Sequence, residues 1–313
     1  MNVLLNHFIN SYSVAKNLSK NYGRINFFKI FIIRFFFAFN FLRKILNKKS
    51  ILVSNVDSGD LFKQKNIKSE MVLINLEKKG FSDDLRLNDL ELDKIASDIS
   101  LNNSKLSFKG KKKISEFISS INNYDNIFDI QEKSKNSNLS HVALEIDINK
   151  TNNIKKIATS DFFVDIAQKY IGNNNISVSS LCYISNPVKT SDFEKKENAQ
   201  FFHYDNDFEK FFKVFIYLND VDEDSGPHSF VQFSHKKKNY KHLYCKRIDD
   251  QEIKEIYGHE NIITFDRPKG SLIFEDTFGL HKGTVPTNKS RIVLILIYGK
   301  NKGIGIYNNS LFV

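Results

Sequence analysis

The segment Phe202-His203-Tyr204-Asp205 carries the clearest chemical pattern in this chain of 313 residues. On a β-strand, residues i and i+2 point to the same face, so His203 and Asp205 could offer an imidazole nitrogen and a carboxylate oxygen to one metal ion. Asp207 is a rival carboxylate, but its spacing from His203 places it badly. One distant histidine would complete a two-histidine, one-carboxylate set, which leaves coordination positions open on iron(II).

His281 is the candidate third ligand, and it follows the apolar run 271–274. Ten residues later, Arg291 opens the most apolar run of the chain, 292–298. A cation at the start of a buried strand must either have a partner or be exposed at the rim. The planar donors of a guanidinium suit a carboxylate, such as the distal carboxylate of 2-oxoglutarate. A His-x-Asp triplet alone is weak evidence, and it gains weight only with this later His and Arg.

Short runs of β-forming residues, separated by turn residues, fill the part of the chain that must position these side chains. Such a pattern indicates a β-sandwich or a jelly roll. Helical spacing predicts helices at 88–100, 112–122 and 160–171, and the Asn-, Ser- and Lys-rich stretch 123–140 predicts a surface loop. The predicted strands are 176–184, 200–204, 213–218, 229–233, 262–265, 271–274 and 292–298.

The net charge of +10 is concentrated at the N-terminus. Residues 1–50 hold nine Lys or Arg residues and no Asp or Glu, which leaves 37 basic (46 minus 9) and 36 acidic residues for the rest. The remainder shows no basic stripe, so we expect no nucleic-acid partner. We divide the chain into a basic, Phe-rich segment 1–50, a connector 51–80 and an oxygenase domain 81–313, with helices in 88–171 and jelly-roll strands in 176–300.

Residues 25–46 are Phe-rich and about as long as a membrane span. Lys29, Arg34, Arg43 and Lys44 interrupt the run, and a charge at the bilayer centre costs roughly 2.5–3.5 kcal/mol on insertion scales. The polar residues fall on one arc of a helix, which favours a basic helix in a membrane interface. A true span and a helix packed on its own domain remain open.

Other common site classes lack their signatures. Two cysteines without a CxxC pair argue against structural zinc or a disulfide framework and favour a reducing, cytoplasmic location. No GxGxxG, P-loop or GxSxG motif is present, which removes the commonest nucleotide-binding and serine-hydrolase interpretations.

Four stretches make residues 81–300 resemble the phytanoyl-CoA dioxygenase (PhyH-like) family of 2-oxoglutarate oxygenases. They are DFFVDIAQKYIG, QFFHYDND, YLNDVDEDSGPHSFVQFSHK and GSLIFEDTFGLHKGTVPTNKSRIVLILIYG. The resemblance implies an α+β, mainly β fold: a double-stranded β-helix (jelly roll, cupin-like) with N-terminal helices packed around it. In the third stretch Phe233 stands where the family has a glycine.

The resemblance also implies the cofactor chemistry. His203, Asp205 and His281 would hold iron(II), and Arg291 would bind the C5 carboxylate of 2-oxoglutarate, with O2 as the second co-substrate. Gly283 stands where the family often has a hydroxyl residue, so Thr284 is expected to supply that group. Tyr183 and Gln200 are further candidate contacts to the co-substrate or substrate. His228 and His235 are expected to shape the rim of the site.

The expected activity is hydroxylation of an unactivated C–H bond in a small-molecule, lipid or glycan-precursor substrate, with succinate and CO2 as co-products. Some relatives are halogenases that lack the carboxylate ligand, so the presence of Asp205 favours hydroxylation. The rival interpretations are a silent jelly-roll scaffold and a cupin-like metalloenzyme without 2-oxoglutarate. We expect a cytoplasmic protein, peripheral to the inner membrane if residues 25–46 bind it.

Overall fold

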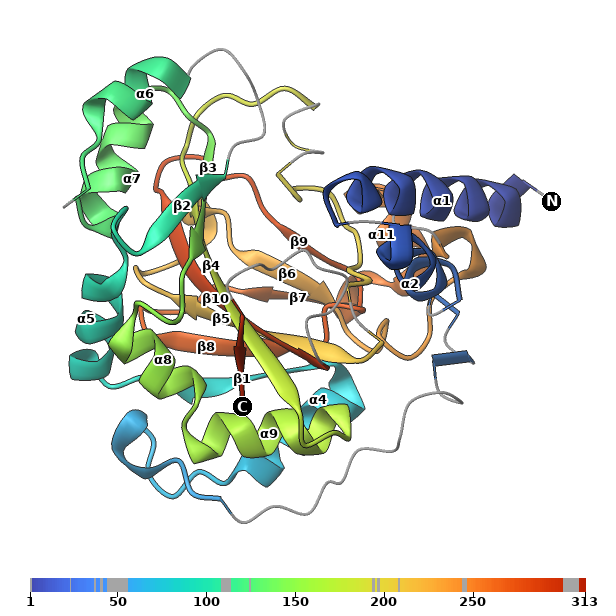
Figure 1. Cartoon of the computed structure of the whole chain (residues 1–313), viewed down its shortest axis with the longest axis horizontal. Helices are drawn as coiled ribbons and strands as arrows, with labels where there is room; N and C mark the ends of the chain where they lie inside the picture. Colours follow the sequence, from blue (N-terminus) through green and yellow to red (C-terminus); the bar gives the residue numbers. More distant parts are fainter. Residues whose placement is uncertain are drawn as a thin grey trace.

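The computed structural model describes residues 2–22, 24–36, 38–39, 42–43, 56–107, 114–123, 125–192, 195, 198–207, 209–243, 247–300 and 310–313. Two antiparallel β-sheets face each other, and helices cover the outer face of the larger sheet (Figure 1). This is the jelly-roll architecture that was predicted, an α+β fold with a mainly β core and helices around it.

The large sheet has the strand order β1-β8-β5-β10-β4-β3-β2, and the short strand β11 pairs with β4. The long strands β4 and β10 run through its middle and pair over ten residues. The strands are β1 (Phe81–Arg86), β2 (Ser104–Ser107), β3 (His141–Ile146), β4 (Ile176–Ser185), β5 (Phe211–Tyr217), β8 (Ser271–Glu275), β10 (Arg291–Lys300) and β11 (Leu311–Phe312).

The small sheet has the order β7-β6-β9. Its strands are β6 (His228–Val231), β7 (Ile262–Phe265) and β9 (His281–Gly283). A bridge between His203 and His281 attaches the 202–205 segment to the edge strand β9, and a second bridge joins Phe202 to Ile248.

Strand β10 shows how the sequence builds two cores from one sheet. Successive side chains of a strand point to opposite faces. Val293, Ile295 and Ile297 therefore join the core between the two sheets, where Phe230 of β6 meets them. Leu294, Leu296 and their outward neighbours join the core under the helices. A strand buried on both faces must be apolar throughout, which is why 292–298 is an unbroken apolar run.

Helices α4 (Ser69–Lys79) and α9 (Asp161–Ile171) pack together against the large sheet. Further helices in the described part of the body are α5 (Asp89–Asp98), α6 (Ile114–Ser120), α7 (Ile127–Asn136), α8 (Asn152–Ala158) and α11 (Asp250–Tyr257). Helix α9 buries Phe163, whose ring stacks on Phe274 of β8 and Tyr298 of β10. It ends at Gly172, whose φ of 71° is left-handed, a conformation that glycine adopts without strain.

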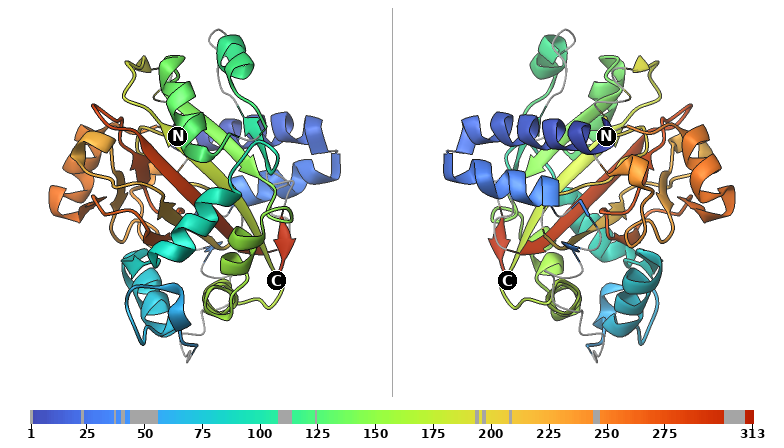
Figure 2. Two further views of the ribbon diagram at one scale, coloured as in Figure 1. Left: turned by 90° about the vertical axis from the view of Figure 1, so that its left-hand side faces the viewer. Right: turned by 90° about the vertical axis from the view of Figure 1, so that its right-hand side faces the viewer.

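The N-terminal segment forms a helical hairpin, α1 (Asn2–Tyr22) and α2 (Arg24–Phe36). The two helices lie antiparallel, side by side, at one end of the β-sandwich (Figure 2). Among the helices that the structure describes, none is long and apolar enough to span a bilayer.

Several predicted boundaries differ from the structure. Strands β1, β2 and β3 join the large sheet although all three precede residue 176. Helix α7 occupies most of the predicted loop 123–140, and α4 lies within the predicted connector 51–80. The prediction of a single helix over residues 25–46 is wrong, because helix α2 ends at Phe36. Residues 37, 40, 41 and 44–46 lie outside the described part of the chain. The predicted strand 200–204 is reduced to isolated bridges.

Replacing Phe163 with Ala should show that the helical layer stabilises the sheet. The ring is fully buried, so its loss should cost about 3–5 kcal/mol of unfolding free energy. Phe128→Ala is the matched control, because that ring is 45% exposed and its loss should change stability by less than about 0.5 kcal/mol. Urea denaturation measures both variants, and equal losses would contradict this packing.

Candidate active site

The structure brings the three predicted ligand side chains together. Their ligand atoms all lie within 4.8 Å of one another, and Asp207 is not a member of the group. Nε2 of His281 lies 3.5 Å from Asp205 Oδ2, and Nε2 of His203 lies 3.9 Å from Asp205 Oδ1. The two imidazole rings have centroids 4.3 Å apart. One metal ion fits between two imidazole nitrogens and one carboxylate oxygen at these separations.

Main-chain pairing accounts for this convergence. The amide of His203 donates to the carbonyl of His281 at 3.0 Å, and the amide of His281 donates back at 2.8 Å. The amide of Asp205 then donates to the Thr277 carbonyl at 2.8 Å. Two segments that are 78 residues apart in the chain are therefore held in register at the edge of the small sheet.

Each histidine is held in the tautomer that a metal needs. Nδ1 of His203 lies 2.9 Å from the Phe201 carbonyl, and Nδ1 of His281 lies 3.0 Å from the Gly279 carbonyl. A carbonyl only accepts, so Nδ1 carries the proton in both rings and Nε2 keeps its lone pair. Such bonds fix ring orientation and raise ligand basicity.

The charge states also suit a metal. Burial lowers the pKa of His281, and burial together with the charge of Arg247 lowers the pKa of His203, so both rings are neutral near pH 7. Burial opposes ionisation of Asp205, but the Lys213 ammonium and the two imidazoles outweigh it and hold its pKa below the ordinary range. The site therefore presents two neutral nitrogens and one anionic oxygen.

Lys213 is a site residue that the sequence reasoning missed. Its Nζ lies 2.7 Å from Asp205 Oδ2 and 3.7 Å from Asp207 Oδ2. Lys213 and Phe215 lie two residues apart on β5, so both side chains point to the core between the sheets. A single cation on the core face of the run FFKVFIY was the feature of the sequence that could have revealed this residue. Asp207 thus belongs to an ionic cluster beside the ligands.

Glu275 is a second residue that was missed, because it is fully buried behind His281. Its Oε2 lies 2.9 Å from Nε2 of His228, and its Oε1 lies 3.8 Å from Nδ1 of His281. Burial raises the pKa of Glu275 to about 8 and lowers the pKa of His228 to about 3, so the pair is uncharged at neutral pH. His228 is therefore a buried support of His281 and not a rim residue. His235 is also buried and lies 3.3 Å from the Glu77 carbonyl.

Arg291 is only 6% exposed, and among the described residues its guanidinium forms no ion pair with a carboxylate. Its donors reach two neutral oxygens, the Thr284 carbonyl at 3.3 Å and the Ser185 hydroxyl at 3.5 Å. A buried cation without a counter-ion is costly, so this geometry fits a site for an added carboxylate.

The close approach of Arg291 explains why residue 283, two positions after His281, is a glycine and not a hydroxyl residue. A Cβ atom at residue 283 would lie 2.6 Å from Nη2 of Arg291. Residues 281 and 283 share one face of β9, so the guanidinium lies over the same face that carries the histidine ligand. Any side chain at residue 283 would displace the guanidinium.

The other predicted co-substrate contacts lie near this region. Thr284 meets Arg291 through its main-chain carbonyl. Tyr183 packs against the core between the sheets, and burial raises the pKa of its hydroxyl. The charges of Lys213 and Asp205 also act on this pKa. Gln200 is 7% exposed, and its Oε1 atom has no hydrogen-bond partner among the described residues. Their roles in binding the co-substrate stay predictions.

Comparison with known proteins shows the family of the chain. The model of the family "Phytanoyl-CoA dioxygenase (PhyH)" matches residues 111–293. No curated protein matches the chain. Solved structures with a similar fold include HygX from Streptomyces hygroscopicus with nickel and 2-oxoglutarate bound, at 12% identity and a TM-score of 0.47, covering 74% of this chain and 87% of that chain.

Two further solved structures are similar at the same level. AviO1 from Streptomyces viridochromogenes Tue57 has 10% identity and a TM-score of 0.45, covering 77% of this chain and 98% of that chain. The non-heme alpha-ketoglutarate-dependent carbocyclase SnoK of nogalamycin biosynthesis has 12% identity and a TM-score of 0.47, covering 74% and 83%. The family match spans more than half of the chain, and the described site provides a ligand set for iron. The chain belongs to the phytanoyl-CoA dioxygenase family and is an iron- and 2-oxoglutarate-dependent enzyme.

Proposed function

We propose that this enzyme is a hydroxylase that converts an unactivated C–H bond of a small-molecule, lipid or glycan-precursor substrate into C–OH. His203, Asp205 and His281 hold the iron, and Arg291 holds the C5 carboxylate of 2-oxoglutarate. The observation that carries the proposal is the three-ligand cluster with its carboxylate, next to a buried arginine that has no carboxylate partner among the residues that the structure describes.

When bound, iron with 2-oxoglutarate and O2 supplies an oxidant strong enough for this bond: one oxygen atom enters the product, and the other enters succinate as CO2 leaves. The chain itself contributes geometry and charge. The carbonyls of Phe201 and Gly279 orient the imidazoles, and the Lys213 ammonium holds Asp205 ionised. Apolar side chains between the sheets, such as Phe215 and Val293, keep water from the site.

Asp205 is the residue that favours hydroxylation over halogenation. A halide can bind iron only where the carboxylate ligand is missing, and here the Asp205 carboxylate lies within reach of both imidazoles. Incubation with cell extract, iron(II), 2-oxoglutarate and 18O2 tests this directly. A product that carries one labelled oxygen would support hydroxylation. Succinate formation with an unlabelled, dehydrogenated or epimerised product would show a different reaction at the same site.

His281→Ala should weaken metal binding, because it removes a ligand and leaves Asp205 with one imidazole neighbour. The expected loss exceeds the roughly 10–100-fold that removal of an outer partner of a ligand costs. His259→Ala is the matched control, since that histidine is exposed on the surface. Anaerobic calorimetry with iron(II) measures both variants. Equal affinities would exclude His281 as a ligand.

Gly283→Ala should weaken 2-oxoglutarate binding while leaving the metal ligands in place. The added methyl would meet Nη2 of Arg291 at 2.6 Å and push the guanidinium aside. Loss of one charge-assisted contact corresponds to about a 10-fold or greater rise in Kd for 2-oxoglutarate. Calorimetry on manganese-loaded protein measures the change.

Lys282→Ala is the control for this prediction, because Lys282 neighbours Gly283 on β9 but bonds to Asp250. An unchanged Kd in the glycine variant would mean that Arg291 does not hold the co-substrate.

A further inference from the structure

The α1–α2 hairpin presents a large apolar surface to solvent. Its exposed apolar side chains are 42–69% accessible, although other large apolar residues of the chain are mostly buried. We call this set the outer face. It consists of Leu4, Leu5, Phe8, Ile9 and Tyr12 on α1, and Phe28, Ile32 and Phe36 on α2.

Both helices contribute to the same side of the hairpin. Phe8 packs against Phe31 and Phe35, and these contacts form the seam between the helices. Ile9 follows Phe8 by one residue, and Ile32 and Phe36 follow Phe31 and Phe35 in the same way, a rotation of about 100°. Because the helices are antiparallel, equal rotations away from a shared seam lead to one common side.

The opposite side of the hairpin is attached to the body of the enzyme. The side-chain amide of Asn206 donates to the carbonyls of Ile33 and Arg34 at 3.0 and 3.1 Å. The outer face is therefore a free apolar surface on an element that the protein already holds in place. Apolar patches of this kind mark interaction sites.

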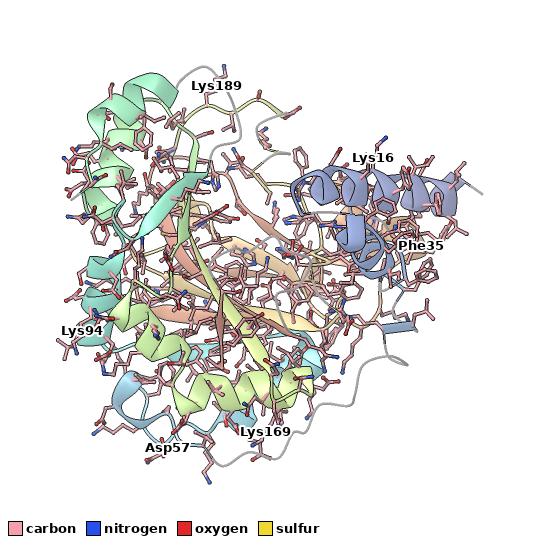
Figure 3. The ribbon with its side chains drawn as sticks, in the orientation of Figure 1. Lys16, Phe35, Asp57, Lys94, Lys169 and Lys189 are labelled. Atoms are coloured by element: carbon pink, nitrogen blue, oxygen red, sulfur yellow. The ribbon has the colours of Figure 1, made fainter. Side chains whose placement is uncertain are left out.

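The charge of the segment selects the partner. Residues 1–50 contain nine Lys or Arg residues and no acidic residue, and Lys16 projects from α1 into solvent (Figure 3). An apolar helical face in a segment that is rich in basic residues and has no acidic residue is suited to an anionic membrane interface. A second copy of the chain fits poorly, because two such segments would bring like charges together.

We propose that the outer face docks the enzyme on an anionic lipid bilayer, with its apolar side chains among the acyl chains and the exposed Lys16 at the headgroups. The docking surface is linked to the metal site through an ionic chain. Nη2 of Arg34 on α2 lies 3.6 Å from Asp207 Oδ1, Lys213 Nζ lies 3.7 Å from Asp207 Oδ2, and Lys213 in turn bonds Asp205.

A second contact between the N-terminal segment and the metal site comes from Arg43, which lies after the end of α2 in the sequence. The guanidinium of Arg43 lies 4.0 Å from the ring of Phe278, which precedes His281 by three residues. The hairpin contacts the segment 202–207, and Arg43, which follows the hairpin, contacts the segment 276–281. A hairpin on a bilayer holds the active site close to the membrane surface.

Co-flotation with vesicles tests the proposal on the full chain. The probes are vesicles of phosphatidylcholine alone and vesicles that also contain phosphatidylglycerol. The wild type should float with the anionic vesicles at least about ten-fold more than with the neutral ones, and added salt should reduce the difference. A wild-type protein that floats with neither kind of vesicle would overturn the proposal.

The variant Leu5→Gln/Ile9→Gln/Ile32→Gln removes three side chains of the outer face, and glutamine keeps helix propensity. It should lose at least about ten-fold in vesicle binding. The matched control, Leu90→Gln/Ile118→Gln/Phe128→Gln, changes three apolar residues that are 45–65% exposed elsewhere, and it should bind as the wild type does. Circular dichroism checks that both triple variants keep their helix content.

Equal binding of the two triple variants would overturn the proposal. So would a dimer in light scattering that only the outer-face variant abolishes, since that result would assign the surface to a second copy. Binding needs no iron or substrate, so failure here leaves the proposed hydroxylase activity standing.

Discussion

The reciprocal main-chain hydrogen bonds between His203 and His281 are the constraint on which the site depends. They pair two short segments that have little regular structure of their own: β9 has three residues, and 202–203 form only bridges. A shift of one residue in this pairing would turn one imidazole to the other face of the sheet. The core between the sheets therefore fixes the register, and the register fixes the ligands.

Burial is the second constraint, and it explains the charged residues that surround the ligands. An ionised carboxylate between two sheets is costly unless it is paired. Lys213 pairs Asp205, and Asp207 with Arg34 extends the pairing toward the N-terminal hairpin. Behind His281, Glu275 and His228 avoid the cost in another way, because their shifted pKa values leave both groups neutral. Within the described part of the chain, Arg291 is left as a buried cation with neutral acceptors alone, and this asymmetry suits an anionic co-substrate.

Sequence patterns predicted the parts of the fold and site that local rules govern. The His-x-Asp spacing identified two candidate ligands because strand periodicity is local, and the apolar run after Arg291 identified the central strand. Lys213 and Glu275 escaped notice, since a charge within an apolar strand reveals its partner only when the strands are paired. Helix α7 was missed although Asn126 and Asp129 form a capping box, a signal that polar composition concealed. Helix α1 has no acidic residue in its first turn and rests largely on its packing with α2.

The most direct test of the account is the weak visible absorption band that an iron(II)–2-oxoglutarate chelate gives in the absence of oxygen. The account predicts that the band appears in the wild type only when both iron(II) and 2-oxoglutarate are present. The band should disappear in His281→Ala, because that change removes an imidazole ligand, and it should weaken in Arg291→Ala, because that change removes the cation that holds the co-substrate. A folded wild-type protein that shows no band at any iron concentration would contradict the assignment of His203, Asp205, His281 and Arg291 to one cofactor site.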